Sequence, residues 1–210
     1  MTRFGDCRPN EVVQKPGFGK CGRLKGGPRP GEGDQFGFDP APGFVICWPM
    51  PQRDFILRLI EEAAQVLAKV VLNREAAQYD QAVYTVIDSM EKLFGLGVSE
   101  LAALDADQLY AQLTREEHPE TARDKCIIFA ALNYQAGLAY EGKDLTALAQ
   151  PAFHLSLVFT LRALTAYPGA NLPPFTPRVE DLLCHLEGFE LPASTAELLE
   201  AYRTGAGACA

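Results

Sequence analysis

"ETARDKCIIFAALNYQAGLAYEG", residues 120–142, and "LTALAQPAFHLSLVFTLRALTAY", residues 145–167, decide the fold class of this chain. Both segments show helical spacing of apolar residues and lack the two-residue alternation that marks a strand. Only two residues separate them, so the two helices should fold back on each other as an antiparallel hairpin. We expect Pro119 in the first turn of the first helix and Asp144 as the cap of the second. Pro151 should kink the second helix or mark its true start.

Small and aromatic residues recur in this pair at the spacing of a tetratricopeptide repeat. Gly137 and Tyr140 in the first segment, with Ala149 and Phe153 in the second, match half of the signature positions of that repeat, which is about 34 residues long. The signature tryptophan and the terminal proline are absent in register, and an ordinary hairpin with small residues at its crossing explains the same pattern. The predicted fold class is all-α: antiparallel helical hairpins, tetratricopeptide-like as a partial helical repeat.

Six further helices follow from apolar residues at helical spacing and from capping residues. Two long helices come first: one from its N-cap Asp54 to Asn73, and one from Ala76 to Phe94, which Gly95 ends. Two short helices follow, one capped by Ser99 and one by Asp105, which forms a capping box with Gln108. The last two run from the cap Thr176, with Pro177 in the first position, to Gly188, and from Ser194, which forms a capping box with Glu197, to Arg203.

The helix expected at residues 54–73 has a broad apolar face. Its main stripe consists of Ile56, Ile60, Ala63, Leu67 and Val70. A second set of apolar residues widens this face: Leu57, Leu59, Ala64 and Val71. We therefore expect this helix to be buried on two sides.

Residues 1–49 have a different composition from the rest of the chain. They contain ten glycines and seven prolines and show no helical or strand periodicity. Such a segment buries too little apolar surface to offset its ordering entropy, so we expect a disordered tail. Its composition also fits an over-extended gene start, with Met50 as the true initiator. The helical domain is then expected to span residues 50–205, followed by a frayed end at 206–210.

The charge of the chain is unevenly distributed. The total is −8, but residues 50–210 hold twelve Lys or Arg against twenty-two Asp or Glu, a net charge of −10. An acidic surface is repelled by phosphate backbones, so no nucleic-acid partner is predicted. Apolar runs such as "CIIFAAL" at residues 126–132 are too short to cross a bilayer, and the N-terminus has no secretory pattern. We expect a cytoplasmic protein with no membrane partner.

The cysteines and histidines form no recognisable catalytic or metal-binding pattern. None of the six cysteines forms a C-x-x-C pair, and we expect Cys126 and Cys184 to be buried thiols. His118 should lie at a solvated helix end, and His154 should be a hydrogen-bonded residue of the core. No catalytic residue, metal ligand or cofactor is predicted. One alternative stays open: an enzyme or small-ligand-binding bundle with a pocket near Cys126 and His154.

The segments "DFILRLIE" at residues 54–61 and Leu93–Leu109, together with the hairpin above, resemble an uncharacterised bacterial family of tetratricopeptide-like helical proteins. Its members open with a D-[YF]-I-x-R-x-I-E helix almost at the initiator methionine and carry an L-G-L-x-x-x-x-L-x-x-L-x-x-x-x-L segment. The resemblance covers residues 52–203 and favours a start at Met50. It implies an all-helical domain of unknown function and transfers no activity, cofactor or catalytic residue.

The function predicted from these observations is a non-enzymatic helical-repeat module that binds a protein or a peptide. Association into a homodimer is a further expectation. In helical-repeat proteins, polar residues on the first helix of a pair can hold a peptide. Arg123, Asn133 and Tyr134 are therefore the candidate peptide-binding residues, although an ordinary surface position is the simpler explanation for each.

Overall fold

The structure, a computed structural model, describes residues 52–167 and 172–207. Every regular element within these residues is an α-helix, as the sequence predicts, and no strand occurs among them. The expectations for residues 1–49, for Met50 and for residues 208–210 fall outside the described part. The helices are α1 (Gln52–Glu75), α2 (Tyr79–Phe94), α3 (Val98–Ala103), α4 (Ala106–Thr114), α5 (Pro119–Glu141), α6 (Thr146–Ala166), α7 (Val179–His185) and α8 (Ala193–Gly207).

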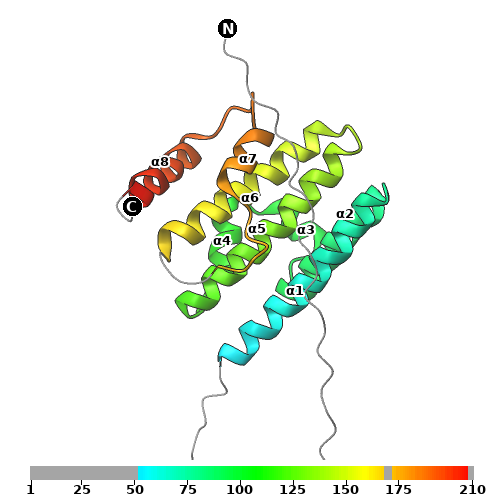
Figure 1. The fold of residues 1–210 in the computed structure, drawn as a ribbon. Coiled ribbons are helices and arrows are strands. Elements are labelled where there is room, and N and C mark those ends of the chain that lie inside the picture. Colours follow the sequence, from blue (N-terminus) through cyan, green and yellow to red (C-terminus); the bar gives the residue numbers. More distant parts are fainter. Residues whose placement is uncertain (1–51, 168–171, 208–210) are drawn as a thin grey trace, which may run out of the picture. The chain divides into compact units, whose positions relative to one another are not determined.

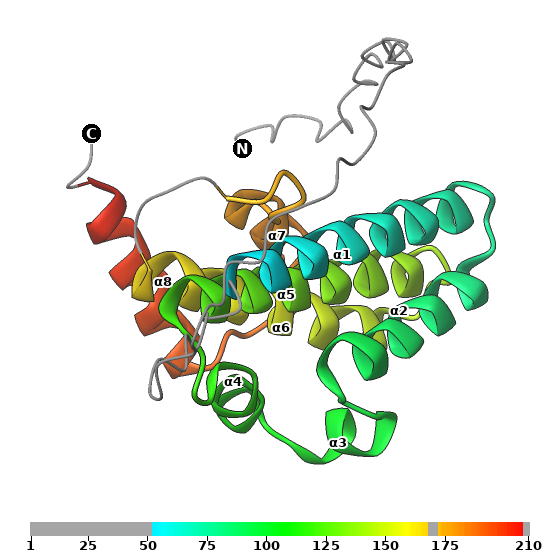
Figure 2. The ribbon, with the colours of Figure 1, turned by 90° about the horizontal axis from the view of Figure 1, so that it is seen from below.

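The α5–α6 hairpin lies at the centre of the helical unit (Figure 1). The α1–α2 hairpin packs against α5, and α7 and α8 both pack against α6. Helix α4 contacts α5 and α6, and Figure 2 shows α3 and α4 on the side of the central hairpin away from α7. Helix α3 buries no residue. Helix α5 is therefore surrounded by neighbours, and most of its side chains from Thr121 to Ala139 are buried.

The two central helices approach closely where a glycine faces an aromatic ring. A Cβ atom built on Gly137 would lie 2.6 Å from Cε1 of Phe153, well inside van der Waals contact. A hydrogen bond crosses the same interface: the Ser156 hydroxyl donates to the carbonyl oxygen of Ala130 at 2.8 Å. This close approach fits both explanations of the small and aromatic residues, a partial repeat and an ordinary hairpin with small residues at its crossing.

The two hairpins are joined by a similar contact at their turns. The ring of Tyr79, at the start of α2, lies against Gly142, where a Cβ atom would come within 2.5 Å of the ring. Beside it, Lys143 forms an ion pair with Asp80. The start of α2 is therefore fixed against the turn between α5 and α6, which sets the position of α1 along α5.

Two clusters of buried apolar side chains hold the unit together. The first core cluster joins α1, α2, α4, α5 and α6, and includes the rings of Phe129 and Phe159 at a centroid separation of 4.5 Å. The second core cluster surrounds Phe153 and joins α6 to α7 and α8. Each buried leucine or phenylalanine stabilises the folded state by about 1.5–3 kcal/mol relative to exposure. The two clusters share the central hairpin, so neither can form without it.

Several helix boundaries match the prediction. Gly95 ends α2 in the left-handed conformation, with φ of 68°. Asp105 and Gln108 form the predicted capping box at α4, and Pro119 begins α5. Pro151, however, lies inside α6, which starts at Thr146 and remains one helix, so the expectation that it could mark the true start is wrong.

The other predicted caps are wrong, because the helices begin at different residues. Asp54 lies within the first turn of α1, and the cap of α3 is Gly97, whose N–H donates to Glu100 Oε2. Asp144 takes a left-handed conformation, φ 57°, one residue before the cap of α6. Thr176 donates to the Pro173 carbonyl instead of capping α7, whose N-cap is Arg178. Ser194 lies inside α8, which continues to Gly207, beyond the expected domain end at residue 205.

Helix α6 corrects the expectation that no segment could cross a bilayer. By length and composition alone it is long and apolar enough to do so, and it is the one such helix in the described ranges. However, 56% of its apolar window is buried within the protein, against α5, α7 and α8. This burial is what the core helix of a folded unit shows.

The glycine–ring contact gives a testable prediction for stability. Gly137→Ala places a methyl group against the fully buried Phe153 ring, so we expect the free energy of unfolding to fall by about 1–3 kcal/mol. The matched control is Gly205→Ala in α8, where a Cβ atom meets nothing within 4 Å and better helix propensity should leave stability equal or higher. Urea unfolding measures both. Equal effects of the two substitutions would contradict the close approach.

Candidate functional site

The second apolar side of α1 is open, which corrects the expectation that this helix is buried on two sides. Its main stripe is buried at Ile56, Ala63, Leu67 and Val70, with Ile60 half-buried, and Leu59 of the expected second set is buried beside them. The neighbouring stripe is not, because Leu57 is 51% exposed and Ala64 and Ala68 are also exposed. Residues one position apart on a helix point about 100° apart, so this second stripe faces away from the first core cluster.

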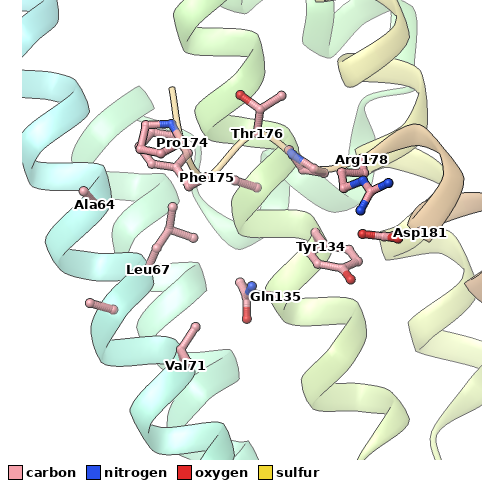
Figure 3. Close-up of a pocket in the computed structure, with 13 residues that line it drawn as sticks. Ala64, Leu67, Val71, Tyr134, Gln135, Pro174, Phe175, Thr176, Arg178 and Asp181 are labelled. Carbon is pink, nitrogen blue, oxygen red and sulfur yellow. The ribbon is translucent and has the colours of Figure 1, made fainter. Parts of the chain in front are cut away.

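A groove with a volume of about 460 Å³ lies along this open stripe. Figure 3 shows Ala64, Leu67 and Val71 of α1 on one side and Tyr134 and Gln135 of α5 on the other. The segment 174–178 and Asp181 of α7 close one end. The lining is mostly apolar and carries a few polar groups, which is the usual character of a binding groove.

The segment before α7 is held in place and gives the groove a fixed end. Pro173 and Pro177 are buried, and Phe175 packs against the first core cluster. The Thr176 hydroxyl donates a 2.6 Å hydrogen bond to the Pro173 carbonyl, and the Thr176 backbone N–H donates to the same oxygen at 3.0 Å. The proline rings restrict the backbone, so this wall loses little conformational entropy when a ligand binds.

Tyr134 joins the groove to the second core cluster. Its ring lies 5.9 Å from the rings of both Phe153 and His185. Burial raises the pKa of the Tyr134 hydroxyl, and the nearby Asp181 carboxylate raises it further. The hydroxyl therefore stays protonated at neutral pH and can both donate and accept a hydrogen bond.

Gln135 places a polar atom without a partner in the groove wall. Its Oε1 atom is buried, and within the described ranges it accepts no hydrogen bond. A buried acceptor without a partner costs about 1–3 kcal/mol. Unpartnered polar atoms are uncommon in native interiors, and one at a groove calls for an explanation.

His185 fixes α7 beside the groove. Its ring stacks on Phe153, with the centroids 4.4 Å apart and an angle of 14° between the planes. Its Nδ1 atom lies 3.2 Å from Oε1 of Glu141 at the end of α5. One histidine therefore joins α7 to both central helices, which positions Asp181 one turn earlier on the same helix.

The three predicted peptide-binding residues do not lie together on one surface. Tyr134 lines the groove. Arg123 is only 7% exposed and pairs with Asp124, and Asn133 is also 7% exposed, with its Nδ2 donating to the Phe129 carbonyl. Peptide binding by any of the three stays a prediction.

The alternative pocket near Cys126 and His154 does not coincide with the groove. Cys126 is fully buried in the first core cluster, and burial raises the pKa of its thiol to about 12. His154 is half-buried between α6 and α8, with Nε2 at 2.9 Å from Oγ1 of Thr195 and its ring beside Phe189. Cys184 is exposed, which corrects the expectation of a buried thiol.

The sequence contains one signal for this groove. The broad apolar face of α1 indicated a second contact surface, but periodicity alone cannot show whether that surface is covered. The remaining lining residues in segment 174–178 come from a loop with no pattern of its own. Gln135 and Asp181 carry no motif, so only their positions in space identify them.

Comparison with protein-family models, with curated proteins and with solved structures finds no match to this chain. The described ranges contain no group of three or more metal-ligating side chains. The resemblance to a tetratricopeptide-like family therefore stays a prediction.

Gln135 gives a prediction for stability without any ligand. Gln135→Met keeps the length of the side chain and removes the buried acceptor, so we expect the free energy of unfolding to rise by about 1 kcal/mol. Gln112→Met, at an exposed position of α4, serves as the control and should change stability by less than about 0.5 kcal/mol. Thermal and urea unfolding measure both variants. A loss of stability in Gln135→Met would mean that its amide is satisfied.

His154 gives a prediction for pH dependence. Burial lowers the pKa of His154 below the ordinary value of 6.5. Between pH 6.5 and this lower pKa, the unfolded chain therefore binds more protons at His154 than the folded chain does. The stability contributed by neutral His154 is complete above pH 6.5 and should be lost as the pH falls through the lower pKa of the folded state. His154→Gln does not titrate and should flatten this part of the curve. Parallel slopes for the two proteins in urea unfolding at a series of pH values would contradict the burial of His154.

Proposed function

We propose that this chain is a non-enzymatic helical module that binds a segment of another protein in the groove between α1, α5 and residues 174–178. One observation carries the proposal: a long helix leaves an apolar stripe open beside a preformed groove of about 460 Å³. Exposed apolar surface next to a concave site is typical of an interaction surface. Leu72, 65% exposed near the end of α1, extends the apolar surface beyond the groove.

The geometry of the helices favours a helical ligand. Helices α1 and α5 contact each other, and α2 contacts both of them, so α2 covers one side of the seam between the pair. The groove follows the same two helices along faces that α2 leaves open. An amphipathic helix packs well over such a seam, with apolar residues at intervals of three and four as its anchors.

The interpretation as a binding module and not an enzyme rests on the groove residues and on Cys126. The groove presents apolar side chains, one tyrosine, one glutamine, one threonine and the two charged residues Arg178 and Asp181. These side chains suit recognition better than covalent chemistry. A thiol with a pKa of about 12, as for Cys126, is almost entirely protonated at neutral pH and is a poor nucleophile.

The same proposal includes the finer features of the sequence prediction. A tetratricopeptide-like arrangement of the hairpins fits a module for protein binding, since such repeats present helical surfaces to peptides. The close approach of Gly137 and Phe153 supports it for one hairpin. A cytoplasmic location belongs to the same proposal.

Blocking the groove tests the proposal. A peptide library displayed on phage is selected against the full chain, and the selected peptides are measured by fluorescence polarisation. Ala68→Gln puts a larger polar side chain into the groove at an exposed helical position, so we expect about a tenfold loss of affinity, which corresponds to about 1.4 kcal/mol.

The matched control is Ala111→Gln, which makes the same change at an exposed position of α4 outside the groove. It should bind the selected peptides as the unchanged protein does. Failure to select any peptide, or equal binding by Ala68→Gln, would rule out the groove as a site for protein segments.

A further inference from the structure

We infer that the partner of the groove is a basic amphipathic helix, with an apolar face flanked by lysine or arginine side chains. This inference rests on the proposed function and adds the chemistry of the partner. The argument comes from the charges at the rims of the groove, from the acceptor in its wall, and from the ligands that the same charges disfavour.

The rim formed by α1 is acidic. Glu61 and Glu75 are exposed and lie on the same helical stripe as Ala64 and Ala68, because positions 61, 64, 68 and 75 follow the helical repeat. Neither carboxylate forms an ion pair in the part of the chain that the structure describes. Both are therefore available to a cationic side chain that approaches over the apolar stripe.

The opposite rim carries one charge of each sign. Asp181 lines the groove, and together with Glu141 it raises the pKa of the Tyr134 hydroxyl, whereas Arg74 lowers it. Arg178 lines the same end, but no ion pair joins it to Asp181 within the described ranges. Asp181 and Arg178 balance each other at this end, so the excess negative charge beside the groove comes from Glu61 and Glu75. Cationic side chains at the flanks of a ligand would be attracted to them.

The wall of the groove adds a preference for donors. Gln135 Oε1 is a buried acceptor without a partner among the described residues. Ammonium and guanidinium groups carry only donors, so a lysine or arginine of the partner could supply this hydrogen bond once the Gln135 side chain turns its buried oxygen toward the groove. A partner with acidic flanks would be repelled at the α1 rim.

The same charges disfavour the other occupants of an apolar groove. A second copy of this chain would bring one acidic surface against another, since residues 50–210 carry a net charge of −10. An anionic membrane surface would be repelled in the same way. A positively charged helix from another protein satisfies both the apolar stripe and the rims.

A set of three synthetic peptides tests the inference on the full chain. The first is about 18 residues long, enough to favour helix formation, with leucines on one face and lysines at its flanks. The second replaces the lysines with glutamates, and the third is a scrambled form of the first that has no apolar face. We expect the lysine peptide to bind about tenfold or more tightly than the glutamate peptide, with the difference shrinking at high salt.

Charge reversal on α1 supplies the matched variants. Glu61→Lys should weaken binding of the lysine peptide about three- to tenfold. Glu62→Lys makes the same change one position further along, about 100° around the helix, and should have a much smaller effect. Both positions are exposed, so both variants should fold, which circular dichroism checks.

The outcomes separate the two levels of the proposal. If neither peptide with an apolar face binds, the proposed function itself is wrong. If the lysine and glutamate peptides bind equally, or if Glu61→Lys and Glu62→Lys act alike, the groove binds helices but the inferred charge of the partner is wrong. Equal binding of the scrambled peptide, or a dimer of the chain that Ala68→Gln dissociates, also overturns the inference.

Discussion

The contact between Gly137 and the ring of Phe153 is the constraint on which the other parts of the structure depend. It lets α5 and α6 approach closely enough for Phe153 to enter the second core cluster. The same ring stacks on His185, which sets the position of α7, and lies beside Tyr134, which lines the groove. One residue without a side chain therefore determines where the central hairpin, the following helix and one wall of the groove lie.

The groove exists because α1 has more apolar surface than its neighbours cover. Helices α2 and α5 bury its main stripe, and the residues at 174–178 reach only one end of the second stripe. Burying such a stripe contributes about 25 cal/mol for each Å² of apolar area. Covering the open surface would therefore stabilise a complex with a partner. The acidic residues beside this surface determine which partners can approach it.

The fold could be predicted from the sequence further than the site could. Helical spacing identified all eight helices of the described ranges, and Gly137, noted in the sequence as a small residue, lies at the crossing of the central pair. Capping residues were less reliable: Asp105 and Gly95 acted as expected, but Thr176 and Ser194 did not. A serine, threonine or aspartate can bond to several nearby backbone groups, and tertiary packing decides which one it meets.

The site was harder to predict because its residues share no sequence pattern. Tyr134 was singled out and does line the groove, whereas Arg123 and Asn133 are buried. Periodicity showed that one α5 face was apolar, but it could not show that neighbours surround nearly the whole helix. The groove depends on where residues 174–178 lie, and this depends on contacts with α1 and α5 that are distant in sequence.

The order of the helices along the chain has a consequence for synthesis of the protein. Helix α6 is the one helix of the described part that is long and apolar enough to cross a membrane, and its face toward the second core cluster is covered by α7 and α8, which follow it in the chain. Domains fold from the N-terminus as they are made, so α6 leaves the ribosome before the residues that shield it. The first core cluster, which includes Phe159, can form once α6 is made, whereas the other face of α6 has to wait for α7 and α8. The growing chain is therefore most prone to aggregate, and most in need of a chaperone, between the synthesis of α6 and that of α8.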